Sequence, residues 1–433
     1  MNAALRSFES QWRDRVPDAL QPIREQAMQR FLKLGLPSLR DETWRYTDLR
    51  SVAAQSFAPA ACTEESAPRL DTAFSLVDAN QAAITLEMMN GCPTSGVRNG
   101  SVNGLEISSI GNILKSNSES LRRFFETASD ADQRRWTLLN TALFVDGLYL
   151  KITHAVTTPI VILHVSTGAS AQAAHPRVII DCEAGASAVI IEHHVSQGEA
   201  APLSNSNTHI ALARGSRLEH YRVYSTGAGA THLDSLDIHQ ARDSHCKQFT
   251  VALGGGLVRS SLEARLGERG ANLDSFSLLV GHQDRHVDCV NVVTHAAPDT
   301  SSRQTARAIA SDVSRVIFNS KVIVDAGAKN ADSKQSCRGL LLSPNAEIDT
   351  RPQLEIHADE VKCAHGATTG RLDPDMLFYL LSRGLDRDTA QSLLVYAFLA
   401  DVLTGMSVTS ARAGIENALI SQLPDSQTLR KFR

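Results

Sequence analysis

Residues 315–328, RVIFNSKVIVDAGA, join a run rich in β-branched residues to a tripeptide with glycine at its centre. Similar tripeptides recur upstream, each with Gly or Asp between a spacer and a small residue: Ala184-Gly185-Ala186, Arg214-Gly215-Ser216, Arg242-Asp243-Ser244, Arg269-Gly270-Ala271, Pro298-Asp299-Thr300 and finally Ala326-Gly327-Ala328. Their central positions are 30, 28, 27, 29 and 28 residues apart. Gly and Asp tolerate the backbone angles of tight turns, so the pattern predicts one turn at the same place in each repeating unit.

The segments between these turns are typical of short strands. PIVILHV at 159–165, AVIIEHHV at 188–195 and KQFTVAL at 247–253 are rich in Val, Ile, Leu and Thr, which favour strands. No helical pattern of ten or more residues separates them, which disfavours a doubly wound α/β sheet. A repeat of this length predicts a β-solenoid, in which each coil stacks on the next. A β-sandwich is the alternative, but sandwiches do not repeat at this length.

The N-terminal segment is predicted to be helical. An apolar stripe recurs at three- and four-residue steps through Leu5, Phe8, Trp12, Val16 and Leu20, as on one face of a helix. A second helical run, 23–34, ends at Gly35, and Pro37 prevents its continuation. A further helix is predicted at 116–128, where serines precede an apolar side made of Leu121, Phe124 and Phe125.

Three helices are predicted near the C-terminus, at 374–383, 387–404 and about 409–421. Asp373 before Pro374, and Asp386 before the second helix, are N-cap signals. The second helix is predicted to have one apolar face, made of Ala390, Leu393, Leu394, Ala397, Phe398 and Val402. These helices are expected to cap the solenoid, to dock a partner, or to do both. The predicted organisation is an N-terminal helical or mixed domain (1–135), a solenoid core (136–370) and a C-terminal helical domain (371–433).

Composition narrows the class of protein. A formal charge of −4 and an aromatic content of 5% disfavour nucleic-acid binding. No apolar stretch approaches the roughly 18 residues of a membrane span, and the first residues lack a signal-peptide core. Seven scattered cysteines without a CxxC pair argue against a disulfide framework. We therefore predict a cytoplasmic protein of a reducing compartment.

Two blocks of sequence resemble a known family. The first runs from Gly35-Leu36-Pro37-Ser38 through Glu42-Thr43-Trp44-Arg45-Tyr46-Thr47-Asp48-Leu49, and the second spans residues 337–385. Both are similar to the SufB/SufD family of iron–sulfur cluster assembly scaffold proteins. The segment 361–368, VKCAHGAT, matches the SufD members in particular. SufB members have a Glu-His-Glu-type sequence there and extra N-terminal cysteines.

The resemblance implies a right-handed parallel β-helix between N-terminal and C-terminal helical domains. It also implies a non-enzymatic scaffold that pairs with a SufB paralogue and docks SufC, an ABC-type ATPase, through its C-terminal helices, with a homodimer possible in isolation. This chain has a glycine run at 254–256 but no P-loop, so nucleotide hydrolysis is assigned to the partner. No cofactor is expected to bind stably to this chain alone, and a transient iron–sulfur cluster is expected at the interface with SufB.

Cys363 and His365 are the candidate cluster ligands. Two residues apart on a predicted strand, they project to one face, and thiolate and imidazole both bind iron. The resemblance implies that the histidine helps to hold a nascent cluster with SufB residues. By itself a C-x-H pair is more often a buried cysteine beside a surface histidine, since two ligands cannot fix a cluster. The ATPase dock is predicted on the first two C-terminal helices, at Met376, Leu377, Tyr379, Leu380, Leu381, Leu393, Leu394, Tyr396 and Phe398.

The other polar candidates have plainer interpretations. Glu355, His357 and Asp359 alternate with apolar residues as one solvated strand face, with metal delivery as the alternative. The remaining histidines, without HxH or HExxH spacing, are interpreted as surface positions on solenoid coils: His193, His194, His220, His282, His286 and His295. Four cysteines on predicted strands are interpreted as core residues: Cys182, Cys246, Cys289 and Cys337.

Two other functions remain open from the sequence. A polysaccharide-acting enzyme is a possibility for a β-helix, but no carboxylate pair recurs at a fixed repeat position. The third interpretation is a SufB-like subunit that accepts sulfur directly.

Overall fold

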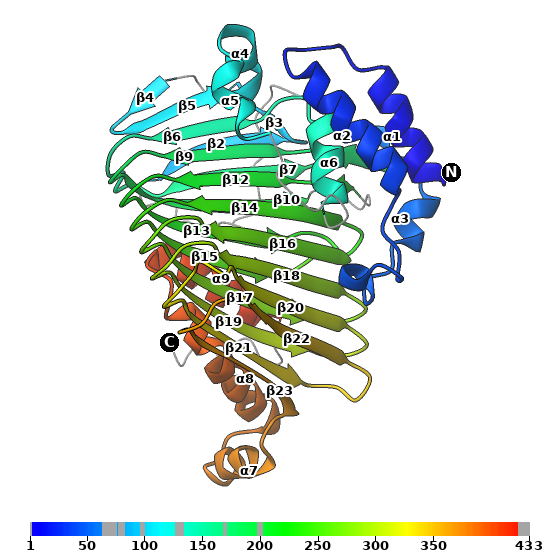
Figure 1. The fold of residues 1–433 in the computed structure, drawn as a ribbon. Helices are drawn as coiled ribbons and strands as arrows, with labels where there is room; N and C mark the ends of the chain where they lie inside the picture. The colour runs from blue at the N-terminus through cyan, green and yellow to red at the C-terminus, as the bar shows by residue number, and fades with distance from the viewer. Residues whose placement is uncertain are drawn as a thin grey trace.

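The protein is a flattened β-solenoid flanked by helices (Figure 1). Its computed structural model describes residues 2–62, 76, 83–95, 100–125, 134–167, 171–196 and 202–422. Each coil contributes one strand to each of two facing sheets, and successive strands of a sheet are parallel and in register. The predicted β-solenoid with helices at both ends is therefore confirmed.

Two stacks of strands form the solenoid walls. Sheet A contains, in order along the stack, β6 (Leu148–Ile152), β9 (Arg177–Cys182), β12 (Asn207–Leu212), β14 (Thr231–Gln240), β16 (Leu257–Leu266), β18 (His286–His295), β20 (Arg315–Val324) and β22 (Glu347–Ile356). Sheet B contains β7 (Ile160–Ser166), β10 (Ser187–Ser196), β13 (Arg217–Ser225), β15 (His245–Ala252), β17 (Asn272–Gly281), β19 (Ser301–Ala310), β21 (Asp332–Leu341) and β23 (Lys362–Arg371).

The turn tripeptides lie where a sheet A strand passes into the next sheet B strand. Five of the six predicted central residues have positive φ: Gly185 (72°), Gly215 (68°), Asp243 (55°), Gly270 (76°) and Asp299 (56°). The sixth turn is longer, and there the positive φ belongs to Asn330 (60°) rather than to Gly327. The recurring turn is thus confirmed, with its key position displaced in one coil.

Inward-facing side chains fill the lumen between the sheets. At the first coils they are largely aliphatic, as in Leu150, Ile162, Ile180, Ile190 and Ile210. Farther along, buried polar residues join them, and a separate apolar cluster around Val287, Val316 and Phe318 lies nearer the last coils. The lumen is a packed core rather than a channel.

Short strands close the first end of the solenoid. β5 (Leu105–Ser109) pairs antiparallel with β6 and with β4 (Gly100–Val102), while β2 (Ile84–Met89) pairs parallel with β7 and antiparallel with β3 (Cys92–Pro93). The short helices α4 (Ile110–Ser116) and α5 (Glu119–Arg122) lie above them (Figure 1). Of the helix predicted at 116–128, the described part contains only α5, and 126–128 lie outside the described residues. A side ribbon contains β1 (Ala58–Pro59), β8 (Gln172–Ala174) and β11 (Leu203–Ser204).

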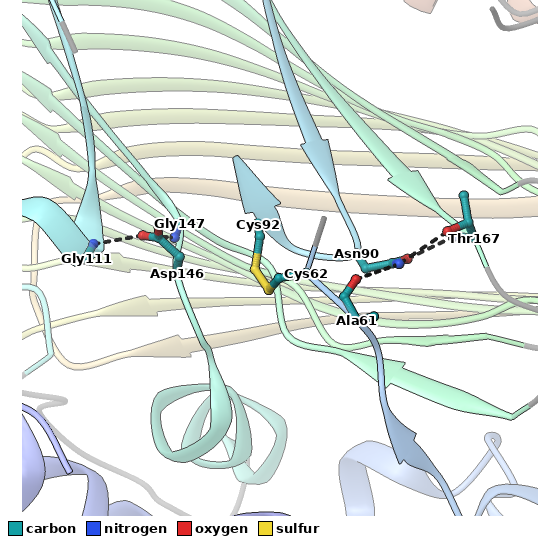
Figure 2. The surroundings of a disulfide bond; sticks show 8 residues. All are labelled: Ala61, Cys62, Asn90, Cys92, Gly111, Asp146, Gly147 and Thr167. Atoms are coloured by element: carbon teal, nitrogen blue, oxygen red, sulfur yellow. Dashed lines mark hydrogen bonds between the residues drawn. A yellow bond between two sulfur atoms is a disulfide. The ribbon is translucent and has the colours of Figure 1, made fainter. Parts of the chain in front are cut away.

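Cys62 and Cys92 form a disulfide at this closed end (Figure 2). The sequence argues against a disulfide framework, yet this one pair forms, and its 30-residue separation gives no local spacing signal. Next to it, the Asn90 Nδ2 donates to the Ala61 carbonyl at 3.0 Å, and the Asn90 Oδ1 accepts from the Thr167 N–H at 2.9 Å. These contacts attach the segment before Cys62 to the first coil.

The N-terminal helices cover sheet A. They are α1 (Ala3–Arg13), α2 (Gln21–Leu34), the 3₁₀ turn η1 (Glu42–Trp44), α3 (Arg50–Ala54) and α6 (Arg135–Leu143). Phe8, Phe31 and Trp136 share a buried cluster with Ala173 and Leu233 of the solenoid. The predicted stripe through Val16 is wrong, because α1 ends before Pro17 and Val16 is 81% exposed.

The C-terminal helices lie against sheet B, with one exception. α8 (Arg387–Leu403) and α9 (Thr409–Ser421) bury Val395, Leu399 and Ile415 against a row of stacked rings: Tyr221, Phe249 and Phe276. α7 (Pro374–Ser382) has no buried residue and projects past the last coil (Figure 1). None of the described helices is long and apolar enough to cross a membrane.

Candidate functional site

The last coil of the solenoid is uncovered. β22 and β23 end the two stacks, and among the described residues no strand pairs with their outer edges. All residues of β23 except Cys363 are exposed, and no residue of β22 is fully buried. Unpaired edge strands ten residues long are a ready template for pairing with another chain.

Cys363 and His365 lie on β23, and strand alternation places both on its luminal face. Their in-register neighbours on β21 are Ser333 and Gln335, which are buried in the lumen. Cys363 packs against the luminal core, and burial raises the pKa of its thiol. His365 is exposed because no further coil stacks on it. The structure thus brings the predicted pair together on the open end.

A column of polar side chains leads through the lumen to His365. In register along sheet B, it contains His220, Gln248, Ser275, Gln304, Gln335 and His365. Across the lumen, Ser320 donates to the Gln304 Oε1 at 2.9 Å and accepts from the Gln335 Nε2 at 2.7 Å. Every member before His365 is buried, so His365 is the one position where this column reaches solvent.

The acidic segment before β23 is partly paired. The Glu355 carboxylate contacts the Lys321 Nζ at 2.6 Å and the His357 Nε2 at 2.9 Å. Lys321 and His357 hold the pKa of Glu355 below its usual value. His357 and Asp359 lie in the turn after β22 rather than on a strand, because β22 ends at Ile356. This arrangement is a solvent-facing ion pair, at the same end of the solenoid as His365.

α7 carries the most exposed apolar surface of the predicted dock. Met376 is 57% and Tyr379 56% exposed, and Leu377, Leu380 and Leu381 are partly exposed. Phe378, which the sequence analysis did not single out, is 72% exposed. The sequence could have indicated Phe378 as part of the dock, because it is an aromatic residue two positions after Met376. An exposed apolar patch of this kind is typical of an interaction surface.

α8 contributes less to that surface than predicted. Its buried face contains Ser392, Val395, Leu399, Val402 and Leu403. Of the predicted apolar face, only Ala390 and Val402 are buried. Leu393 and Leu394 are partly exposed, whereas Tyr396 and Phe398 pack at the rim of the sheet B cluster. The helix is apolar around most of its circumference, so periodicity could not fix its rotation.

The segment 42–47, around Trp44, attaches the N-terminal region to sheet A. The Arg259 guanidinium lies 3.8 Å from the centre of the Trp44 ring, donates to the Thr43 carbonyl at 2.7 Å and pairs with Asp288. Thr47 also contacts Asp288, and Glu42 reaches Arg351 of β22 at 2.5 Å. This segment therefore connects the N-terminal region to the last coil.

The buried cysteines agree with the sequence interpretation, whereas several histidines do not. The four cysteines Cys182, Cys246, Cys289 and Cys337 are buried, as expected. The interpretation of the histidines as surface groups is wrong for His193, His194, His220 and His295, which are at most 2% exposed. Their neighbours, such as Glu192, Arg222 and Asp234, are buried with them. Strand alternation in Glu192-x-His194 and His232-x-Asp234 was the signal that these side chains share the lumen.

Comparison with known proteins covers nearly the whole chain. The family model described as "SUF system FeS cluster assembly, SufBD core domain" matches residues 164–398, and that described as "SufBD protein N-terminal region" matches residues 6–162. The "Iron-sulfur cluster assembly protein SufD" of Escherichia coli is 29% identical, over 91% of this chain and 90% of that protein. An "Iron-sulfur cluster assembly SufBD family protein" of Synechocystis is 26% identical, over 89% and 87%. "Protein ABCI7, chloroplastic" of Arabidopsis thaliana is 26% identical, over 89% and 82%.

Proposed function

Because the chain belongs to the SufBD family of iron–sulfur cluster assembly proteins, we propose that it is a non-enzymatic scaffold subunit whose open solenoid end pairs with SufB. The observation that carries this proposal is the bare last coil, with two unpaired ten-residue edges. A paralogous solenoid offers strands of matching spacing, so the two lumens would continue into one another. We also propose a right-handed winding, the hand favoured for parallel strand crossovers.

The nascent cluster would form at this junction. His365 and Cys363 supply one imidazole and one thiol on the luminal face of β23. Two ligands cannot fix a cluster, so the remaining ligands would come from SufB. The cluster is therefore transient cargo of the interface rather than a cofactor of this chain alone.

The SufC ATPase would dock on α7 and the adjoining surface of α8. Support comes from Met376, Phe378 and Tyr379, each more than half exposed on a helix with no buried residue. ATP binding would draw the docked helices of the two scaffold subunits together and shear the solenoid junction, exposing His365 and Cys363. A homodimer through the same edges is the form expected when SufB is absent.

The test uses the full chain, tagged and co-expressed with SufB and SufC, followed by pull-down and size exclusion. Deleting the C-terminal helices is a poor variant, because α8 and α9 cover the sheet B cluster. A sharper variant is Ala367→Pro. The Lys362 N–H donates to the carbonyl of Ala331, just before β21, so alternation turns the Ala367 N–H to the open edge. Proline removes that donor without breaking the β21 pairing.

The matched control is Ala367→Ser, which keeps the N–H at the same position. We expect SufB to co-purify with the wild type and with Ala367→Ser, and to be lost from Ala367→Pro. If SufB does not co-purify with the wild-type chain, the scaffold proposal is contradicted. Equal SufB recovery with both variants contradicts pairing through the edge of β23.

A further inference from the structure

The lumen of the first coils contains a compact group of buried, chemically reactive side chains far from the open end. His194 on β10 faces His232 and Asp234 on β14 across the space between the two sheets. One ligand atom from each residue lies within 4.8 Å of the other two. All three side chains are at most 2% exposed.

The hydrogen bonding of this group is incomplete. Among the described residues, the His194 Nε2, both ring nitrogens of His232 and the Asp234 Oδ2 have no hydrogen-bond partner. Buried polar atoms in proteins almost always have one. Asp234 has an ion contact with Arg222, whose Nη2 lies 3.4 Å from Oδ2. Arg222 can balance the charge of Asp234, but it offers nothing to the two imidazoles.

We propose that His194, His232 and Asp234 bind a divalent first-row transition-metal ion inside the solenoid. Two imidazoles and one carboxylate are a ligand set that such ions favour over alkaline-earth ions. Small side-chain rotations would bring the three atoms to the usual bond length of about 2.1 Å.

The surroundings hold the ligands in place. The Asp234 Oδ1 accepts from the Ser206 N–H at 3.0 Å, which fixes the orientation of the carboxylate. The His194 ring stacks on the rings of His164 and Tyr224, with 4.3 Å and 5.1 Å between the ring centres. Supporting contacts of this kind are what orient metal ligands.

A neighbouring group of ligand type is a weaker candidate. His164, Glu192 and His194 also have ligand atoms within reach of one another. However, the Glu192 carboxylate already accepts from Thr208 at 2.8 Å and contacts the His164 Nε2 at 3.0 Å and the His220 Nε2 at 2.8 Å. The unpartnered atoms therefore favour the group of His194, His232 and Asp234.

The ion would have a structural role. It would join β10 of sheet B to β14 of sheet A within a closed core, where a folded chain offers it little access. The ion would therefore enter during folding, and its binding would stabilise the folded state. This role is separate from cluster assembly at His365.

The experiment refolds the full chain, without a histidine tag and in a His365→Ala background, after chelator treatment and with Zn²⁺ or Co²⁺. Metal content is measured after size exclusion, together with the visible spectrum of bound Co²⁺. We expect about one retained ion per chain and a higher unfolding temperature with metal than without. A chain that retains no ion and unfolds at the same temperature with and without metal overturns the proposal.

The ligands are tested with two variants. His232→Gln combined with Asp234→Asn should lose the ion and the stabilisation by metal. His193→Gln is the matched control, because His193 is equally buried and adjacent to His194 but lies on the opposite face of β10. Retention of the ion by the double variant, or its loss from His193→Gln, contradicts the assigned ligands. If the double variant fails to fold, the wild-type comparison with and without metal still decides the matter.

Discussion

The two ends of the solenoid are built from the same repeating coil, but only one is covered. At the first end, β5 pairs antiparallel with β6 and β2 pairs parallel with β7, and Ile110 of α4 and Leu121 of α5 are buried there. At the last end, β22 and β23 have no outer partner among the described residues, and α7 buries nothing. The strand register continues into this end, as the column ending at His365 shows.

The difference shows where the chain depends on a partner. Proteins usually protect edge strands with short pairing elements, charges or covering helices. This chain does so at one end and leaves two long edges at the other, beside its most exposed aromatic residues. Changes at the closed end or in the sheet covers should therefore alter stability, whereas changes at the open end should alter assembly.

The largest effect is expected from His365→Ala. In the co-expressed complex, iron and sulfide content should fall by about tenfold or more, as expected for the loss of a ligand. The unfolding temperature of the isolated chain should not change, because His365 is exposed. His357→Ala is the control, since His357 is also exposed at this end but not on β23. If His365→Ala keeps its full iron and sulfide content, His365 is not a cluster ligand.

Trp44→Ala should produce the largest loss of stability in the N-terminal cover. Trp44 is 3% exposed and lies over the Arg259 guanidinium. Its removal should lower the free energy of unfolding by about 3–5 kcal/mol, measured by denaturant titration. Phe378→Ala at the open end should leave that free energy within about 0.5 kcal/mol of the wild type. An equal loss of unfolding free energy in Trp44→Ala and Phe378→Ala would contradict the difference between the covered sheet and the open end.

Phe378→Ser should weaken SufC binding without unfolding the chain. An exposed aromatic residue at the centre of a dock typically contributes about 2 kcal/mol to binding, so we expect a loss of roughly tenfold or more in affinity by calorimetry. Val313→Ser is the control, because Val313 is similarly exposed, at 60%, on a solenoid turn. Unchanged affinity in Phe378→Ser would place the dock elsewhere.

The smallest effect concerns acid stability of the N-terminal cover. His175 is buried beside Phe8, its Nδ1 lies 3.2 Å from the Asn205 Nδ2, and burial lowers its pKa to about 3. The unfolded chain takes up a proton near pH 6.5, whereas the folded chain does so only near pH 3. Stability from this group is therefore lost as pH falls from about 6.5 toward 3. Between pH 7 and pH 5, the unfolding temperature of His175→Gln should therefore fall less than that of the wild type.

The exposed His154→Gln serves as the control for that measurement. It should keep the acid sensitivity of the wild type. An equal drop in unfolding temperature for wild type and His175→Gln would assign the acid sensitivity to other groups.

The sequence predicted the solenoid because its turns require particular backbone angles. Gly185, Asp243 and Asp299 mark positions that must take positive φ, and such positions recur once per coil. The same local logic placed Cys363 and His365 on one strand face. It failed at Val16, where Pro17 ends the helix that an apolar stripe would continue.

Long-range features escaped the sequence for a physical reason. Whether a strand edge is bare depends on what stacks on it, and no property of β23 itself encodes that. The lumen position of His194 and His232 depends on which face of each strand turns inward. The rotation of α8 was hidden because apolar residues surround most of the helix. The pairing of Cys62 with Cys92 joins a segment to the first coil without a spacing signature.

The most direct test of the account is hydrogen exchange at the backbone amides of β23, with and without SufB. In the isolated chain, the amides of Cys363, His365, Ala367 and Thr369 point to the open edge and should exchange rapidly. Pairing with SufB should protect them, while the amides facing β21 should change little. A stable complex in which these four amides still exchange as rapidly as in the isolated chain would contradict the open end as the assembly site.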